Sequence, residues 1–118
     1  MKVPKRFKLF GATVDVVDNP KLQWERGWSG SASYDKHKIE LVPISDSFEV
    51  SRASYEQTFC HELSHFLCYY AGGVINSKIG GFLHQDEEFV DLLGVLLHQA
   101  ITTMEYQPPP AEAGGLKE

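Results

Sequence analysis

The 118-residue sequence predicts a single α+β domain in which a small antiparallel or mixed sheet packs on two helices. Three observations predict it. Strand-like segments lie before residue 44, a helical period begins near residue 51, and a second apolar helical pattern occupies residues 86–104. A chain of this length supports one core, so we expect one domain over 1–106. The Pro/Gly-rich tail 107–118 has the composition of a disordered terminus.

Two segments carry the strand predictions. Residues 6–18, "RFKLFGATVDVVD", are rich in Phe, Val and Thr and end at an Asn-Pro turn, which predicts one or two strands. A Gly/Ser-rich loop then leads into a strand over residues 37–43. We expect this strand at the edge of the sheet, because Pro43 lacks an N–H and Lys36 and Lys38 are charged.

The first helix is predicted from Ser51 or Ser54 to the glycine pair Gly72-Gly73, with a capping box between Ser54 and Gln57. Its apolar positions follow the helical period: Phe59, Leu63, Phe66, Leu67 and Tyr70. The second helix has a wider apolar face, which predicts a second set of buried residues: Phe89, Leu92, Leu93, Leu96, Leu97 and Ile101.

Composition and charge exclude several classes of protein. The formal net charge is −5 and the eleven Lys and Arg form no basic face, so we expect no nucleic-acid partner. No apolar run approaches the roughly 18 residues of a membrane span, and the N-terminus lacks the features of a signal peptide. We therefore expect no membrane association and a cytoplasmic location. Cys60 and Cys68 lie too far apart along one helix for a disulfide and are expected to be reduced.

The stretch "TFCHELSHFLCYY" contains His61-Glu62-x-x-His65 within the first predicted helix. Two histidines four residues apart lie one helical turn apart, and the 100° step per residue turns them away from the apolar stripe. Both imidazoles can therefore reach one Zn²⁺ ion. Glu62 lies at the edge of the same face, where it can accept a proton from a water without binding the metal itself.

A zinc site that leaves a position for water needs a third protein ligand. Carboxylates occur at the start of the second helix, at Asp86, Glu87, Glu88 and Asp91. Acidic residues are also favoured there by the helix macrodipole alone. The residues by themselves leave the choice open, although Glu88 points about 100° away from Glu87.

The chain resembles the minimal gluzincin metallopeptidases, a group of small phage and bacterial proteins related to the ImmA/IrrE-like peptidases. The resemblance covers roughly residues 7 to 104. It rests on a "G-x-x-x-Y-D-x-x-x-I-x-L" segment (30–41), the H-E-x-x-H helix (58–67) and "E-x-F-V-x-x-L" (87–93). This family has a zincin-like fold, with a sheet packed on the H-E-x-x-H helix and on a second, ligand-bearing helix.

The resemblance implies a zinc-dependent peptidase in the cytoplasm of a bacterial or phage-infected cell. It makes Glu87 the third ligand beside His61 and His65, and Asp91 an acceptor for the N–H of His61. A likeness to SprT-like peptidases instead offers His84 as third ligand. A protein or peptide substrate would add along the edge strand 37–43, and Glu62 would act as general base.

Two further hypotheses remain beside the peptidase. One is a catalytically inert interaction module with a zincin fold, stabilised by zinc between its helices. The other is a metal-free α+β domain with a polar helix face. No oxyanion-stabilising residue is assigned by the sequence, although Tyr55, Tyr69, Tyr70 and His84 are candidates. His37 and His98 are expected to have surface or packing roles.

Overall fold

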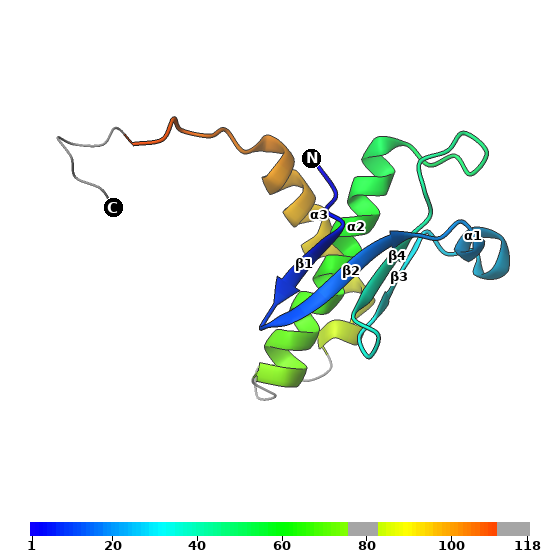
Figure 1. Cartoon of the computed structure of the whole chain (residues 1–118), viewed down its shortest axis with the longest axis horizontal. Coiled ribbons are helices and arrows are strands. Elements are labelled where there is room, and N and C mark those ends of the chain that lie inside the picture. The colour runs from blue at the N-terminus through cyan, green and yellow to red at the C-terminus, as the bar shows by residue number, and fades with distance from the viewer. Residues whose placement is uncertain (76–82, 111–118) are drawn as a thin grey trace.

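The computed structural model describes residues 1–75 and 83–110 and shows a small α+β domain with a four-stranded mixed sheet and three α-helices (Figure 1). The strands are β1 (Arg6–Leu9), β2 (Ala12–Asp18), β3 (Gly30–Ser33) and β4 (Lys38–Leu41). The helices are α1 (Lys21–Arg26), α2 (Arg52–Cys68) and α3 (Glu87–Thr103). A π-helical segment, Tyr69–Ile75, continues α2, and a 3₁₀ turn, Leu83–Gln85, precedes α3.

The sheet has the strand order β1-β2-β4-β3. Strands β1 and β2 form an antiparallel hairpin whose two-residue turn, Phe10-Gly11, has positive φ at both positions. This turn geometry matches the twist of the flanking strands. Strand β4 pairs parallel with β2 and antiparallel with β3. The mixed sheet expected from the sequence is therefore present.

The predicted position of strand 37–43 at the sheet edge is wrong. Strand β4 lies between β2 and β3, and its Ile39 and Leu41 are fully buried. The edge on this side of the sheet is formed by β3, which the sequence predicted as a loop. Glycine and serine have low strand propensity, but pairing with β4 and packing against α2 override it.

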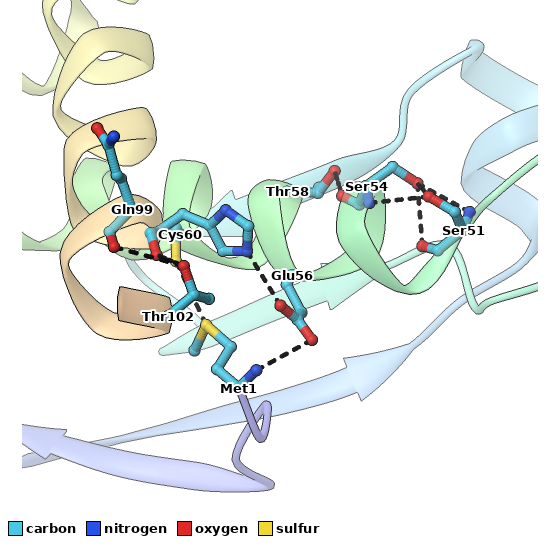
Figure 2. Close-up of polar contacts among 9 residues, drawn as sticks. Met1, Ser51, Ser54, Glu56, Thr58, Cys60, Gln99 and Thr102 are labelled. Carbon is cyan, nitrogen blue, oxygen red and sulfur yellow. Dashed lines mark hydrogen bonds and ion pairs between the residues drawn. The ribbon is translucent and has the colours of Figure 1, made fainter. Parts of the chain in front are cut away.

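Helix α2 is the central element and lies between the sheet and α3 (Figure 1). Its start at Ser51 agrees with the predicted boundary, although Ser51 forms its capping box with Ser54 rather than Ser54 with Gln57 (Figure 2). The predicted stop at Gly72-Gly73 is wrong, because the π-helical segment runs through both glycines. Both cysteines are free and buried, as expected.

The core lies between α2 and the sheet. It consists of residues from both layers: Val14, Ile39, Leu41, Phe59, Cys60, Phe66 and Tyr70. Three of the five apolar positions predicted for the first helix are thus buried, Phe59 and Phe66 in α2 and Tyr70 in the π-helical segment, and Leu63 packs against the same cluster.

Helix α3 differs from the prediction. Phe89, Leu92 and Leu96 were expected to be buried, but they are 39%, 56% and 52% exposed. The helix instead turns Val90 and Gly94 toward α2. Beyond it, residues 104–110 are exposed and lack regular structure (Figure 1). The predicted disorder of the rest of the tail, 111–118, concerns residues outside the described ranges.

No helix within the described ranges combines the length and the apolar character needed to cross a membrane.

Candidate metal centre

Two histidines of α2 and one carboxylate of α3 converge in the lining of one cleft. The Nε2 atom of His61 lies 3.2 Å from one carboxylate oxygen of Glu87, and Nε2 of His65 lies 3.0 Å from the other. Zinc bonds of about 2.0–2.1 Å in a tetrahedral site place neighbouring donor atoms about 3.3 Å apart. Each of the two histidine–Glu87 distances is therefore close to the donor spacing of such a site.

Glu62 lies beside this set and is buried, with only 7% of its surface exposed. The metal-ligating atoms of His61, Glu62 and His65 all lie within 4.8 Å of one another, so this group could hold a metal ion. Burial, and secondly the nearby Glu87 carboxylate, raise the pKa of Glu62 to about 8. A cation between these groups would favour the ionised carboxylate and offset both effects.

The Nδ1 atoms of both histidines have polar partners. This favours Nε2 of each ring as the atom that can bind a metal ion. The Nδ1–H of His65 donates to the backbone carbonyl of His84 at 2.7 Å, which leaves a lone pair on Nε2. The Nδ1 of His61 lies 3.5 Å from a carboxylate oxygen of Asp91. Burial lowers the pKa of His65, which favours the neutral form that binds metals.

The structure brings His61, Glu62, His65, Glu87 and Asp91 to the lining of one cleft. This is the set that the gluzincin resemblance implied, whereas the residues alone left the third ligand open. It places the side chain of His84 elsewhere. The His84 ring packs edge-on against Tyr34 and Tyr69, its Nδ1 has no hydrogen-bond partner among the described residues, and the ring does not line the cleft. The residue contributes its backbone carbonyl to His65 instead.

Two glycines permit this close assembly, and the sequence reading overlooked both roles. A Cβ atom at Gly94 would lie 2.9 Å from Cα of His61, so the glycine allows α3 to approach the backbone of α2 at the first histidine. A Cβ atom at Gly30 would lie 3.0 Å from a carboxylate oxygen of Glu62 and 2.6 Å from Thr58. Strand β3 therefore passes directly beside the buried carboxylate.

Tyr34 is a further contact that the sequence reading missed. Its hydroxyl lies 3.2 Å from Nδ1 of His65, and its ring stacks on Tyr69 with 4.5 Å between the ring centres. Burial, with smaller contributions from Glu62 and Glu87, raises the pKa of this tyrosine. Gly30 and Tyr34 both belong to the "G-x-x-x-Y-D" segment. This pattern was the sequence feature that could have indicated their places beside the site.

The cleft measures about 540 Å³ and is lined by residues of three segments. They belong to strand β3 with the residues just before it, to α2, and to α3, which contributes Glu87 and Asp91. None of the four residues considered for oxyanion stabilisation lines it. Tyr55 donates to Asp18 instead, and Tyr70 is buried in the core.

No protein-family model, curated protein or solved structure matches this chain.

Proposed function

We propose that the protein is a zinc-dependent metallopeptidase in which His61, His65 and Glu87 hold the metal and Glu62 is the general base. The observation that carries the proposal is the convergence of both histidine Nε2 atoms on the two oxygens of Glu87, with a separate buried carboxylate beside them. The resemblance to the minimal gluzincins gives the same assignment. The donor set, two imidazoles and one carboxylate, suits zinc and leaves a fourth position open.

The residues of the chain have distinct roles in this mechanism. Zinc, when bound, lowers the pKa of water at its open position and polarises a carbonyl oxygen. Glu62 accepts the proton of the attacking water and returns it to the leaving amine. Asp91 and the carbonyl of His84 hold the two imidazoles in orientation, as partners beyond the ligands commonly do.

An extended peptide would lie along β3 rather than along the interior strand β4. The backbone N–H of Val42 donates to the carbonyl of Ser29, so these two residues form a hydrogen-bonded pair. Such pairs alternate along an antiparallel register, and the N–H and C=O groups of Gly30 and Ala32 therefore point away from β4. These groups can pair with a substrate strand. The peptide would then pass beside Glu62, since Gly30 lies next to that carboxylate.

The second candidate function is a zinc-stabilised interaction module without catalysis. It is favoured by the position of the three ligands, which join α2 to α3 and would stabilise a small domain directly. The free carboxylate of Glu62 distinguishes the candidates, because a purely structural site gains nothing from it.

The first test is zinc content by inductively coupled plasma mass spectrometry after reconstitution and desalting. We expect about one zinc per chain in the parent and loss of zinc in His65→Ala and Glu87→Ala. Matched controls are His98→Ala, a histidine outside the cleft, and Glu88→Ala, the neighbouring exposed carboxylate. Both controls should retain zinc. A parent that binds no zinc would overturn the proposal.

The second test separates the two candidate functions. Glu62→Gln should keep its zinc but cleave a random hexapeptide pool at least about 10²-fold more slowly than the zinc-loaded parent. Cleavage is read by mass spectrometry. Equal rates in both proteins would remove Glu62 as the base, and zinc binding without any cleavage by the parent would favour the interaction module.

A further inference from the structure

The cleft extends beyond the metal ligands to a region lined by Trp28, Ser29 and Gln57. Gln57 precedes His61 by one helical turn on the same face of α2. Strand β3 runs alongside α2 in the same direction, because Gly30 lies beside Thr58 and Glu62 while Tyr34 contacts Phe66 and Tyr69 further along. Trp28 and Gln57 thus lie next to the candidate reaction centre, toward the start of α2.

Gln57 has an amide nitrogen that the fold leaves unused. Its Nε2 is buried from solvent and has no hydrogen-bond partner among the described residues. Buried amide donors in native proteins nearly always have an acceptor, so one without a partner calls for a specific explanation. Gln57 also lines the cleft, and rotation about its side-chain torsions, which breaks no hydrogen bond of this nitrogen among the described residues, would turn the amide toward backbone carbonyl oxygens of a peptide lying there.

Trp28 contributes an exposed aromatic surface to the same region. Its side chain is 46% exposed, and the guanidinium of Arg26 lies 4.9 Å from its ring centre. An exposed indole adjoining a cleft is a favourable surface for an apolar side chain. Because Arg26 already provides a cation at this ring, a lysine or arginine of a ligand would meet a like charge there. The pair therefore favours an aromatic or large aliphatic side chain.

We propose that Trp28 and Gln57 form a specificity subsite that binds an aromatic or large aliphatic residue of a peptide next to the cleaved bond. Trp28 packs on the side chain and Gln57 donates to a backbone carbonyl of the peptide. This subsite belongs to the cleft of the proposed peptidase and rests on that function for its role. Its ability to bind such residues can be measured without hydrolysis.

Trp24 provides a matched control within the same segment. It is also exposed, at 62%, but it packs against Phe48 with 5.7 Å between ring centres and does not line the cleft. Loss of a tryptophan at position 24 should therefore leave the subsite unchanged. Gln99, an exposed glutamine of α3, is the corresponding control for Gln57.

The binding experiment uses zinc-loaded Glu62→Gln protein with Trp24→Phe, so that fluorescence reports Trp28 alone. N-acetyl-L-phenylalanine amide should change this fluorescence in a saturable manner, and N-acetylglycine amide should bind at least about tenfold more weakly. Gln57→Leu should weaken binding of the phenylalanine probe, while Gln99→Leu should not. Equal responses to both probes, or to both glutamine variants, would overturn the subsite.

The cleavage experiment uses the zinc-loaded parent and the random hexapeptide pool. We expect aromatic and large aliphatic residues to be enriched at one position flanking the cleaved bond, with the enrichment lost in Trp28→Ala and kept in Trp24→Ala. Gln57→Leu should raise KM about tenfold with kcat nearly unchanged. A fall in kcat at constant KM would instead make Gln57 a group acting in the transition state and would overturn the subsite.

The two experiments distinguish failure of the subsite from failure of the peptidase. If the parent cleaves nothing but Trp28 still responds selectively to the phenylalanine probe, the peptidase proposal and the place next to a cleaved bond both fail, while the binding site for an apolar side chain stands. If the parent cleaves peptides with no preference that depends on Trp28, the subsite fails and the peptidase stands.

Discussion

At the scale of single residues, the buried carboxylates on α2 have different surroundings. Glu62 borders the cleft, whereas Glu56 lies outside it, where its two oxygens contact Nε2 of His98 at 3.0 Å and the Met1 ammonium at 3.2 Å (Figure 2). The sequence predicted a surface or packing role for His98, and the structure adds Glu56 as its partner. The hydrogen bond with His98 is the main factor that lowers the pKa of Glu56, and it outweighs the opposing effect of burial.

We predict that Glu56→Gln lowers the free energy of unfolding by about 1–3 kcal/mol at pH 7, because it weakens two buried polar contacts. Since the pKa of Glu56 is lower in the folded protein, its stabilisation is complete above its ordinary pKa of 4.5. The stabilisation is lost as the pH falls through the lowered value. Urea unfolding of parent and variant from pH 3 to 7 should show a difference that shrinks at acid pH. Glu25→Gln, at an exposed position, is the control. A difference independent of pH would contradict the prediction.

At the scale of elements, the approach of α3 to α2 decides whether the candidate centre can form. Gly94 lies against the backbone of His61, and this contact sets the distance from which Glu87 and Asp91 reach the histidines. The close approach also explains why Phe89, Leu92 and Leu96 are exposed. The narrow contact face holds the small residue, and the larger apolar residues lie outside it.

We predict that Gly94→Ala weakens zinc binding at least about tenfold, because the added Cβ forces the two helices apart and moves Glu87 from His61 and His65. The free energy of unfolding should change only modestly. Overpacking lowers it by about 1–3 kcal/mol, and the better helix propensity of alanine offsets about 1 kcal/mol of that loss. Zinc affinity is measured by competition with a chromogenic chelator. Ala100→Gly, which changes propensity at an exposed position of the same helix, should leave the affinity unchanged. Unaltered affinity in Gly94→Ala would mean that the helices need not be so close.

At the scale of the whole molecule, a metal held by residues of both α2 and α3 would couple two layers of the domain. Only the folded chain brings these ligands together, so zinc binding would add to the free energy of unfolding. A domain of this size buries a modest core, and such a contribution would be a large fraction of its stability.

We predict that removing zinc with a chelator lowers the Tm by on the order of 10 °C relative to protein in zinc at about one hundred times its Kd. The same treatment should have little effect on Glu87→Ala, whose site is incomplete. Differential scanning calorimetry at several zinc concentrations checks this prediction, since Tm should rise with the logarithm of free zinc. An equal response of parent and variant would place the stabilising ion elsewhere.

The sequence by itself determined the α+β class, the helix that carries His61, Glu62 and His65, and the acidic start of the following helix. These features depend on local spacing, because residues three or four apart on a helix share a face wherever the helix packs. Tertiary structure decided the rest. It placed β3 rather than β4 at the sheet edge and brought Glu87 to the two histidines through the contact at Gly94. It also put Trp28 into the lining of one cleft with Gln57, whose amide nitrogen has no hydrogen-bond partner among the described residues. Each of these depends on which distant segments meet, and local periodicity carries no information about that choice.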